Sequence, residues 1–236
     1  MTLDPARMTL DPARDLPAAL AAARTDRTAA WRLIADLAAF WGTPLQPGDG
    51  RTDAELDAAE ARLGLRLPAA LREAHLLLGN RPDLTSNHDT LLPPEELYVD
   101  RGHLVHRVEN QGCAYWGVPL AALDQDDPPT VVWPDAADPE ITPWTARLSV
   151  ELLAVVLTEP LLDQDAHVDV GEVDPADLTD WTALPELYEL GVDGRFFARP
   201  DALLLVQEGP WAVMRAVSEE ALDELRQRRP VSWIDY

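Results

Sequence analysis

The stretch ELDAAEARLGLRLPAALREAHLLL, residues 55–78, predicts two short helices joined by a tight apolar turn. Thr52 and Glu55 form a capping-box pattern, in which each side chain accepts from a free backbone N–H at the start of a helix. Leucines and alanines follow at helical spacing until Gly64, which suits the left-handed conformation that ends many helices. Pro68 lies in the first turn of the second helix, where proline is tolerated. We therefore expect a helical hairpin that packs its leucines on a sheet.

Downstream of this hairpin the apolar residues change from helical to alternating spacing. A strand is predicted from Leu104 to Glu109, because the side chains at 104, 106 and 108 alternate with those at 105, 107 and 109. Further strands are predicted at 114–118, 130–133, 195–198, 202–207 and 211–215, and further helices at 148–157 and 218–229. Helices and strands follow one another without strict βαβ alternation, which predicts an α+β fold with a central, mostly antiparallel sheet flanked by helices.

The N-terminal part of the chain predicts a separate organisation. Residues 1–7 and 8–14 are the same heptad written twice, and a duplication at the start of the coding sequence explains this better than a structural repeat. We predict that 1–14 are disordered and without function. Residues 15–50 predict a helical extension and a linker, because the loop-forming sequence GTPLQPGDG at 42–50 marks a boundary. The main domain is then expected over 51–236.

Charge is the strongest feature of the composition. The chain has 42 acidic residues against 19 basic ones, all of them arginine, and its net charge is −23. Residues 108–194 contain nineteen acidic residues and a single arginine, Arg147, which gives that stretch a net charge of −18. Such a field repels nucleic acid and attracts a basic partner. The alternative is a solubilising surface typical of a salt-adapted or high-GC organism.

The sequence also indicates the cellular compartment in which the protein is expected. No apolar run approaches the roughly 20 residues that span a bilayer, and the N-terminus has no signal-peptide pattern, so no membrane association is predicted. Cys113 is the single cysteine, which excludes an intrachain disulfide and fits a reducing compartment. We expect a cytoplasmic protein.

Catalytic and metal motifs are weak. His103 and His106 are three apart, but on a strand they would point to opposite faces, so no metal site or cofactor is predicted there. The Asn87-His88-Asp89 sequence predicts a hydrogen-bonded loop rather than a catalytic pair. Cys113 is predicted to be a small buried residue rather than a nucleophile. Glu109 is the one acid with good neighbouring hydrogen-bond partners, although a plain turn explains it too. These observations favour a protein without enzymatic activity.

The hairpin and three later segments resemble the SUKH superfamily. Its members have a helix with an acidic residue near its end, then a Leu-Gly turn, then a Leu-Pro pair opening a second helix. Here these residues are Glu60, Leu63-Gly64 and Leu67-Pro68, and the later segments are PPEEL at 93–97, ENQG at 109–112 and WGV at 116–118. Gly79-Asn80 transposes the Asn-Gly pair usual in the family. The resemblance covers about 52–229 and implies a single SUKH-like domain.

The resemblance implies a binding function. Most bacterial members of the superfamily are thought to neutralise toxins, often nucleases or deaminases, and eukaryotic relatives act as regulatory scaffolds. Together with the acidity, it predicts an immunity protein that binds and occludes a basic toxin domain; the alternative is a regulatory or scaffold module of the same fold. Carboxylates would take the place of nucleic-acid phosphates, and tryptophans are favoured as anchors because they dominate interface energetics. The predicted partner-binding residues are Glu109, Asp124, Asp126, Asp127, Asp163, Asp165, Asp169, Glu172, Asp174, Trp116, Trp133, Trp144 and Trp181. For each tryptophan, packing in the core is the alternative.

Overall fold

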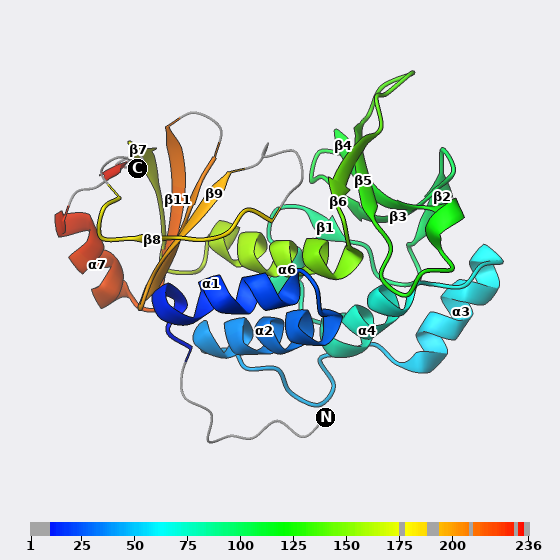
Figure 1. The fold of residues 1–236 in the computed structure, drawn as a ribbon, viewed down its shortest axis with the longest axis horizontal. Helices are drawn as coiled ribbons and strands as arrows, with labels where there is room; N and C mark the ends of the chain where they lie inside the picture. The colour runs from blue at the N-terminus through cyan, green and yellow to red at the C-terminus, as the bar shows by residue number, and fades with distance from the viewer. Residues whose placement is uncertain (1–9, 175–177, 188–193, 208–209, 229–230, 234–236) are drawn as a thin grey trace.

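The computed structural model describes residues 10–174, 178–187, 194–207, 210–228 and 231–233, which form the predicted α+β fold. Figure 1 shows two sheets standing side by side over a layer of helices, with one further helix on the outer side of the second sheet. No helix within the described ranges has both the length and the apolar character needed to cross a membrane.

The first two helices are α1 (Pro12–Ala23) and α2 (Arg27–Phe40). The side chains of Asp11 and Asp26 cap them by accepting from backbone N–H groups in the first turn. Leucines and an isoleucine on their inner faces are fully buried and belong to the main core. The predicted extension over 15–50 is therefore packed into the body of the protein. The predicted disordered start over 1–14 is described only from residue 10, and its last three residues already belong to α1.

The two predicted helices over 52–78 form as α3 (Asp53–Leu63) and α4 (Ala69–Leu78), and are followed by the short α5 (Pro82–Thr85). The expected packing of this hairpin on a sheet is replaced, for α4, by packing on helices α2 and α6 (Leu148–Thr158). Thr52 and Glu55 make both bonds of the capping box. Gly64 ends α3 with a left-handed φ of 68°, where a side chain would be strained. The local signals in this region were sufficient to place both helices.

The first sheet lies over α4 and one end of the helical layer. Its strands are β1 (Thr90–Leu91), β2 (Tyr98–Asp100), β3 (His103–Val108), β4 (Ala114–Pro119), β5 (Thr130–Pro134) and β6 (Thr142–Thr145), with the 3-10 turn η1 (Leu120–Ala122) after β4. The order is β1-β3-β4-β5-β6, β2 also pairs with β3, and the described pairings are antiparallel. The pairing of β3 with β4 has a register shift between Val105 and Arg107, and Glu109 directly follows β3.

Helix α6 (Leu148–Thr158), followed by the 3-10 turn η2 (Glu159–Leu162), connects the two sheets. Ten of its eleven residues are buried, as expected for a helix that is apolar on every side. The start of α6 follows β6 of the first sheet, and η2 contacts β10 and β11 of the second sheet.

The second sheet has the strands β7 (Val168–Val173), β8 (Thr182–Ala183), β9 (Arg195–Arg199), β10 (Ala202–Val206), β11 (Trp211–Ala216) and β12 (Val231–Trp233), in the order β12-β7-β11-β10-β9-β8. One face, with Leu203 and Leu205, joins the main core, and the other, with Leu204 and Met214, forms a second core under α7 (Glu219–Arg228). Both faces of β10 are buried, which explains its continuous apolar run.

The architecture thus differs in one respect from the single central sheet that the sequence predicted. The described strands divide into two six-stranded antiparallel sheets, one on each side of the α6–η2 connection. Alternation of side chains shows where strands form, but it does not show which strands share a sheet, because that depends on contacts far apart in the sequence.

Candidate functional site

The predicted interface residues Asp124, Asp126 and Asp127 lie in the loop before β5. Asp124 and Asp126 are exposed. The Asp127 side chain is only 5% exposed and has an ion pair with Nε of Arg147 at 2.9 Å. It also accepts from the backbone N–H of Ser149 at 2.8 Å and from its hydroxyl at 2.6 Å. Asp127 therefore holds the start of α6 and is not available to a partner, which corrects its assignment to the interface.

The predicted residues at 163–174 lie on and around β7, beyond the other end of α6. Asp169 is mostly buried and pairs with Nε of Arg226 at 2.6 Å, so it attaches α7 to the second sheet. Asp163 lies 3.8 Å from Arg215 and accepts from the backbone N–H of Asp165. Asp165, Glu172 and Asp174 are exposed. The predicted carboxylates therefore form two groups at opposite ends of α6 instead of one surface.

The four predicted tryptophan anchors are buried, in agreement with the alternative of core packing. Trp116, Trp133, Trp144 and Trp181 are each exposed by 7% or less. Among the tryptophans whose side chains the structure describes, Trp211 is the exposed one, at 42%. It pairs with Glu172 directly across β7 and β11. Sequence reasoning missed Trp211, although its position at the first residue of a predicted strand was a signal that the sheet would leave it uncovered.

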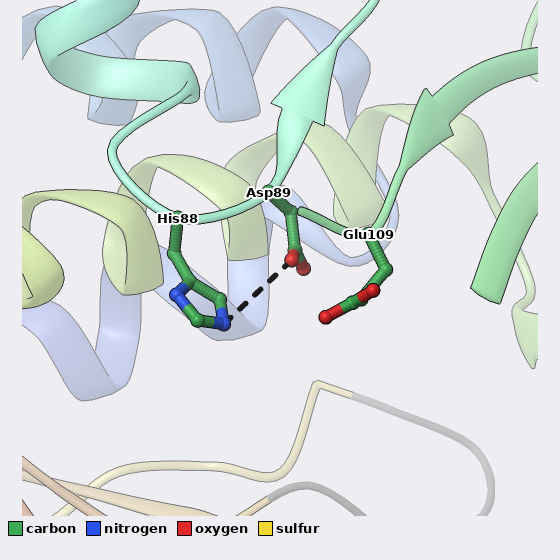
Figure 2. A group of neighbouring side chains, drawn as sticks. All are labelled: His88, Asp89 and Glu109. Atoms are coloured by element: carbon green, nitrogen blue, oxygen red, sulfur yellow. Dashed lines mark ion pairs between the residues drawn. The ribbon is translucent and has the colours of Figure 1, made fainter. Parts of the chain in front are cut away.

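A second cluster joins residues that the sequence kept apart. Figure 2 shows His88 and Asp89, from the loop between α5 and β1, pointing toward Glu109 at the end of β3. One ligand-type atom from each of the three side chains lies within 4.8 Å of the other two. Nε2 of His88 is 3.9 Å from Oδ1 of Asp89. The predicted hydrogen-bonded loop at 87–89 is present, but it also brings an imidazole and two carboxylates together.

The loop is held by a buried ion network beneath it. The Glu159 carboxylate is fully buried and accepts from the backbone N–H groups of His88 at 2.7 Å and Asp89 at 3.3 Å. Nη2 of Arg107 lies 2.9 Å from Oδ2 of Asp89 and 3.1 Å from Oε1 of Glu159. The Arg107 guanidinium also lies over the Trp116 ring, 4.4 Å from its centroid. Arg107 and Glu159 are 52 residues apart, and their pairing was not visible in the sequence.

Glu109 is fixed by its own turn. Its Oε2 accepts from the backbone N–H groups of Gln111 at 2.8 Å and Cys113 at 3.0 Å. The bond from Cys113 is the main reason that the Glu109 pKa lies below its ordinary value. Cys113 itself is exposed, which corrects the expectation that it would be a small buried residue.

A third polar group lies inside the main core. Nε2 of His106 and Oε1 of Glu151 are 2.9 Å apart and both side chains are fully buried. Nearby, His75 on α4 is also buried, and neither of its ring nitrogens has a hydrogen-bond partner within the described residues. Burial, with repulsion from Arg51 and His106, lowers the His75 pKa from 6.5 to about 4. This group is enclosed by the protein and has a structural role.

Comparison with known proteins gave no match to a family model, to a curated protein or to a solved structure. The resemblance to the SUKH superfamily thus has the quoted motifs as its support, and function must be argued from the residues.

Proposed function

We propose that the protein is a non-enzymatic, cytoplasmic binding protein that neutralises a basic protein partner, with a toxin domain as the partner that the SUKH resemblance favours. The observation that carries the proposal is the surface formed by Glu172, Asp174 and Trp211, called here the Trp211 surface. A large exposed aromatic residue beside carboxylates is the combination expected for an anchor that binds next to Arg or Lys side chains.

The positions of these residues support one continuous surface. Glu172 faces Trp211 across the β7–β11 pair, so their side chains leave the sheet on the same side. Asp174 follows Val173, whose N–H donates to the carbonyl of Pro210 immediately before Trp211. An aromatic ring contributes binding area at the centre, and carboxylates around it favour a cationic partner and exclude an anionic one.

The net charge of −18 over 108–194 supports a second part of the mechanism. Long-range attraction toward a cationic groove increases the rate of encounter, and this effect falls as salt screens it. The Trp211 surface would then determine how long the complex lasts, because desolvated aromatic contacts mainly slow dissociation. Binding in the substrate groove of a nuclease or deaminase would occlude it without chemistry.

The test begins with a search beside the gene for one that encodes a secreted protein ending in a toxin-like domain. The affinity and association rate of the full chain for that domain are then measured by surface plasmon resonance. We expect Trp211→Ala to weaken binding by about tenfold or more, and Glu172→Arg with Asp174→Arg to slow association steeply at low salt. Asp124→Arg with Asp126→Arg is the matched control, with the same charge change at the other end of α6. Binding that is unchanged by the Trp211-surface variants and by salt would refute the proposal. A partner without toxic activity would favour the scaffold alternative instead.

A further inference from the structure

The cluster of His88, Asp89 and Glu109 has features that the proposed binding function does not use. Its three side chains come from two segments that are 20 residues apart, and they point into one space (Figure 2). The set contains an imidazole as well as two carboxylates, so it differs from the exposed acidic groups found across this surface.

The supporting contacts hold the backbone that carries the three side chains in place. Both backbone N–H groups of the His88-Asp89 pair donate to the buried Glu159 carboxylate, which fixes the loop. Arg107 binds Oδ2 of Asp89, while Oδ1 is the oxygen nearest His88 and also accepts from the backbone N–H of Asn110 at 3.3 Å, which leaves it a second lone pair. The hydrogen bonds that the Glu109 carboxylate accepts in the described part of the chain go to Oε2, so Oε1 remains for a ligand.

The imidazole has a partner that can orient it. The side-chain nitrogen Nδ2 of Asn110 lies 3.1 Å from Nδ1 of His88 and 3.4 Å from its Nε2. If the Asn110 amide is turned by 180°, its oxygen takes that position and can accept from Nδ1–H, which directs the Nε2 lone pair toward Asp89 and Glu109. Hydrogen bonding of the second ring nitrogen is the usual way in which proteins orient a metal-binding histidine.

The charges at the cluster favour a divalent cation. Asp89, Glu109 and Glu159 contribute three carboxylates, and Arg107 contributes one positive charge, so these four groups have an excess of two negative charges beside the His88 ring. Because Arg107 is buried and bound to Asp89 and Glu159, it cannot move out to neutralise Glu109. A doubly charged ion would balance this excess.

We propose that His88, Asp89 and Glu109 form a site for a divalent first-row transition metal ion such as Zn²⁺ or Mn²⁺. Imidazole ligands favour these metals over Mg²⁺ and Ca²⁺, which prefer sites made of oxygen atoms. Two ligands of one such ion lie about 3 to 3.5 Å apart. The 3.9 Å between His88 and Asp89 and the spacing of up to 4.8 Å within the group are wider, so the side chains of His88 and Glu109 must turn inward when the ion binds. Water would complete the coordination.

The test is isothermal titration calorimetry of the full chain with ZnCl₂ and with MnCl₂, at about 0.15 M salt to screen diffuse binding to the acidic surface. We expect one bound ion per chain, and a loss of affinity of at least tenfold in His88→Ala and in Glu109→Gln. His167→Ala is the matched control, since it removes another exposed histidine with acidic neighbours, and it should leave the affinity unchanged. Asp89 is left intact because its bond to Arg107 supports the fold.

Thermal unfolding supplies a second readout, since an ion that binds only the folded state raises the midpoint. Zn²⁺ should raise it in the native chain and in His167→Ala, but not in His88→Ala. Absence of stoichiometric binding would overturn the proposal, as would binding that His88→Ala and His167→Ala weaken equally. The proposed function is independent of this outcome, because its test involves Trp211 at a different place in the fold.

Discussion

Replacing His75 by leucine should remove a pH dependence that is built into the core. His75 is 1% exposed, its ring nitrogens lack hydrogen-bond partners in the described structure, and its pKa is about 4. The unfolded chain binds a proton at His75 near pH 6.5, whereas the folded chain does so only near pH 4. Stability from the neutral ring is therefore complete above pH 6.5, falls as the pH is lowered through this window, and is lost below about pH 4.

The size of the effect follows from the change in pKa. The His75 pKa falls from 6.5 in the unfolded chain to about 4 in the folded chain. Each tenfold change in proton affinity is worth about 1.4 kcal/mol, so this fall corresponds to about 3 kcal/mol in the free energy of unfolding. Urea unfolding followed by tryptophan fluorescence between pH 7 and pH 4 measures it. Between pH 7 and pH 4 the free energy of unfolding of the native chain should fall by about 3 kcal/mol more than that of His75→Leu.

The control for this experiment is Leu71→Val, which alters a fully buried neighbour on the same helix without removing a titrating group. It should lower the free energy of unfolding by about 1 kcal/mol at every pH. Parallel curves for the native chain and His75→Leu would refute the reasoning, as would a His75 ring that titrates near pH 6.5 by NMR.

Three further changes test the fold. Arg107→Met should lower the free energy of unfolding by about 3 to 5 kcal/mol in urea titrations, because Glu159 is then buried without its counter-charge; a loss below about 1 kcal/mol would contradict the network. Thr52→Ala should cost about 1 kcal/mol by the same assay through loss of the capping box, and Thr52→Ser should restore most of it. Gly50→Ala should cost about 3 kcal/mol or more, since the added Cβ would lie 1.7 Å from the backbone oxygen of Leu76; a thermal midpoint equal to that of the native chain would contradict this packing.

The features that the sequence predicted correctly are local. The capping box of Thr52 and Glu55 and the left-handed turn at Gly64 each depend on residues within one helical turn, so short patterns identify them. The strand from His103 to Val108 and the buried helix α6 were likewise predicted by spacing and composition. The fold class followed from the order of such elements.

The features that could not be predicted depend on distant pairs. In the sequence Asp127 resembles the neighbouring exposed aspartates. In the structure it accepts from the backbone N–H of Ser149, 22 residues later, and so holds the start of α6. Arg107 and Glu159 belong to no sequence motif, and they come together under the loop at 87–89 only when the chain folds. Tryptophan is common both in cores and in interfaces, so residue type alone could not separate Trp133 from Trp211. The candidate sites were accordingly predicted only in part, through Glu109 in the cluster with His88 and Asp89 and through Glu172 and Asp174 beside Trp211.

The contact between helix α1 and strand β9 has a consequence for biosynthesis. Leu16 and Phe196 lie in one core but are 180 positions apart in the sequence. When the first helices leave the ribosome, the strands that will cover them have not yet been translated. The part of α1 that packs on β9 must therefore stay uncovered until residues 195–199 have been translated, although α2 can pack on α1 much earlier. This makes the nascent protein a candidate client for chaperones and predicts slow acquisition of the native state.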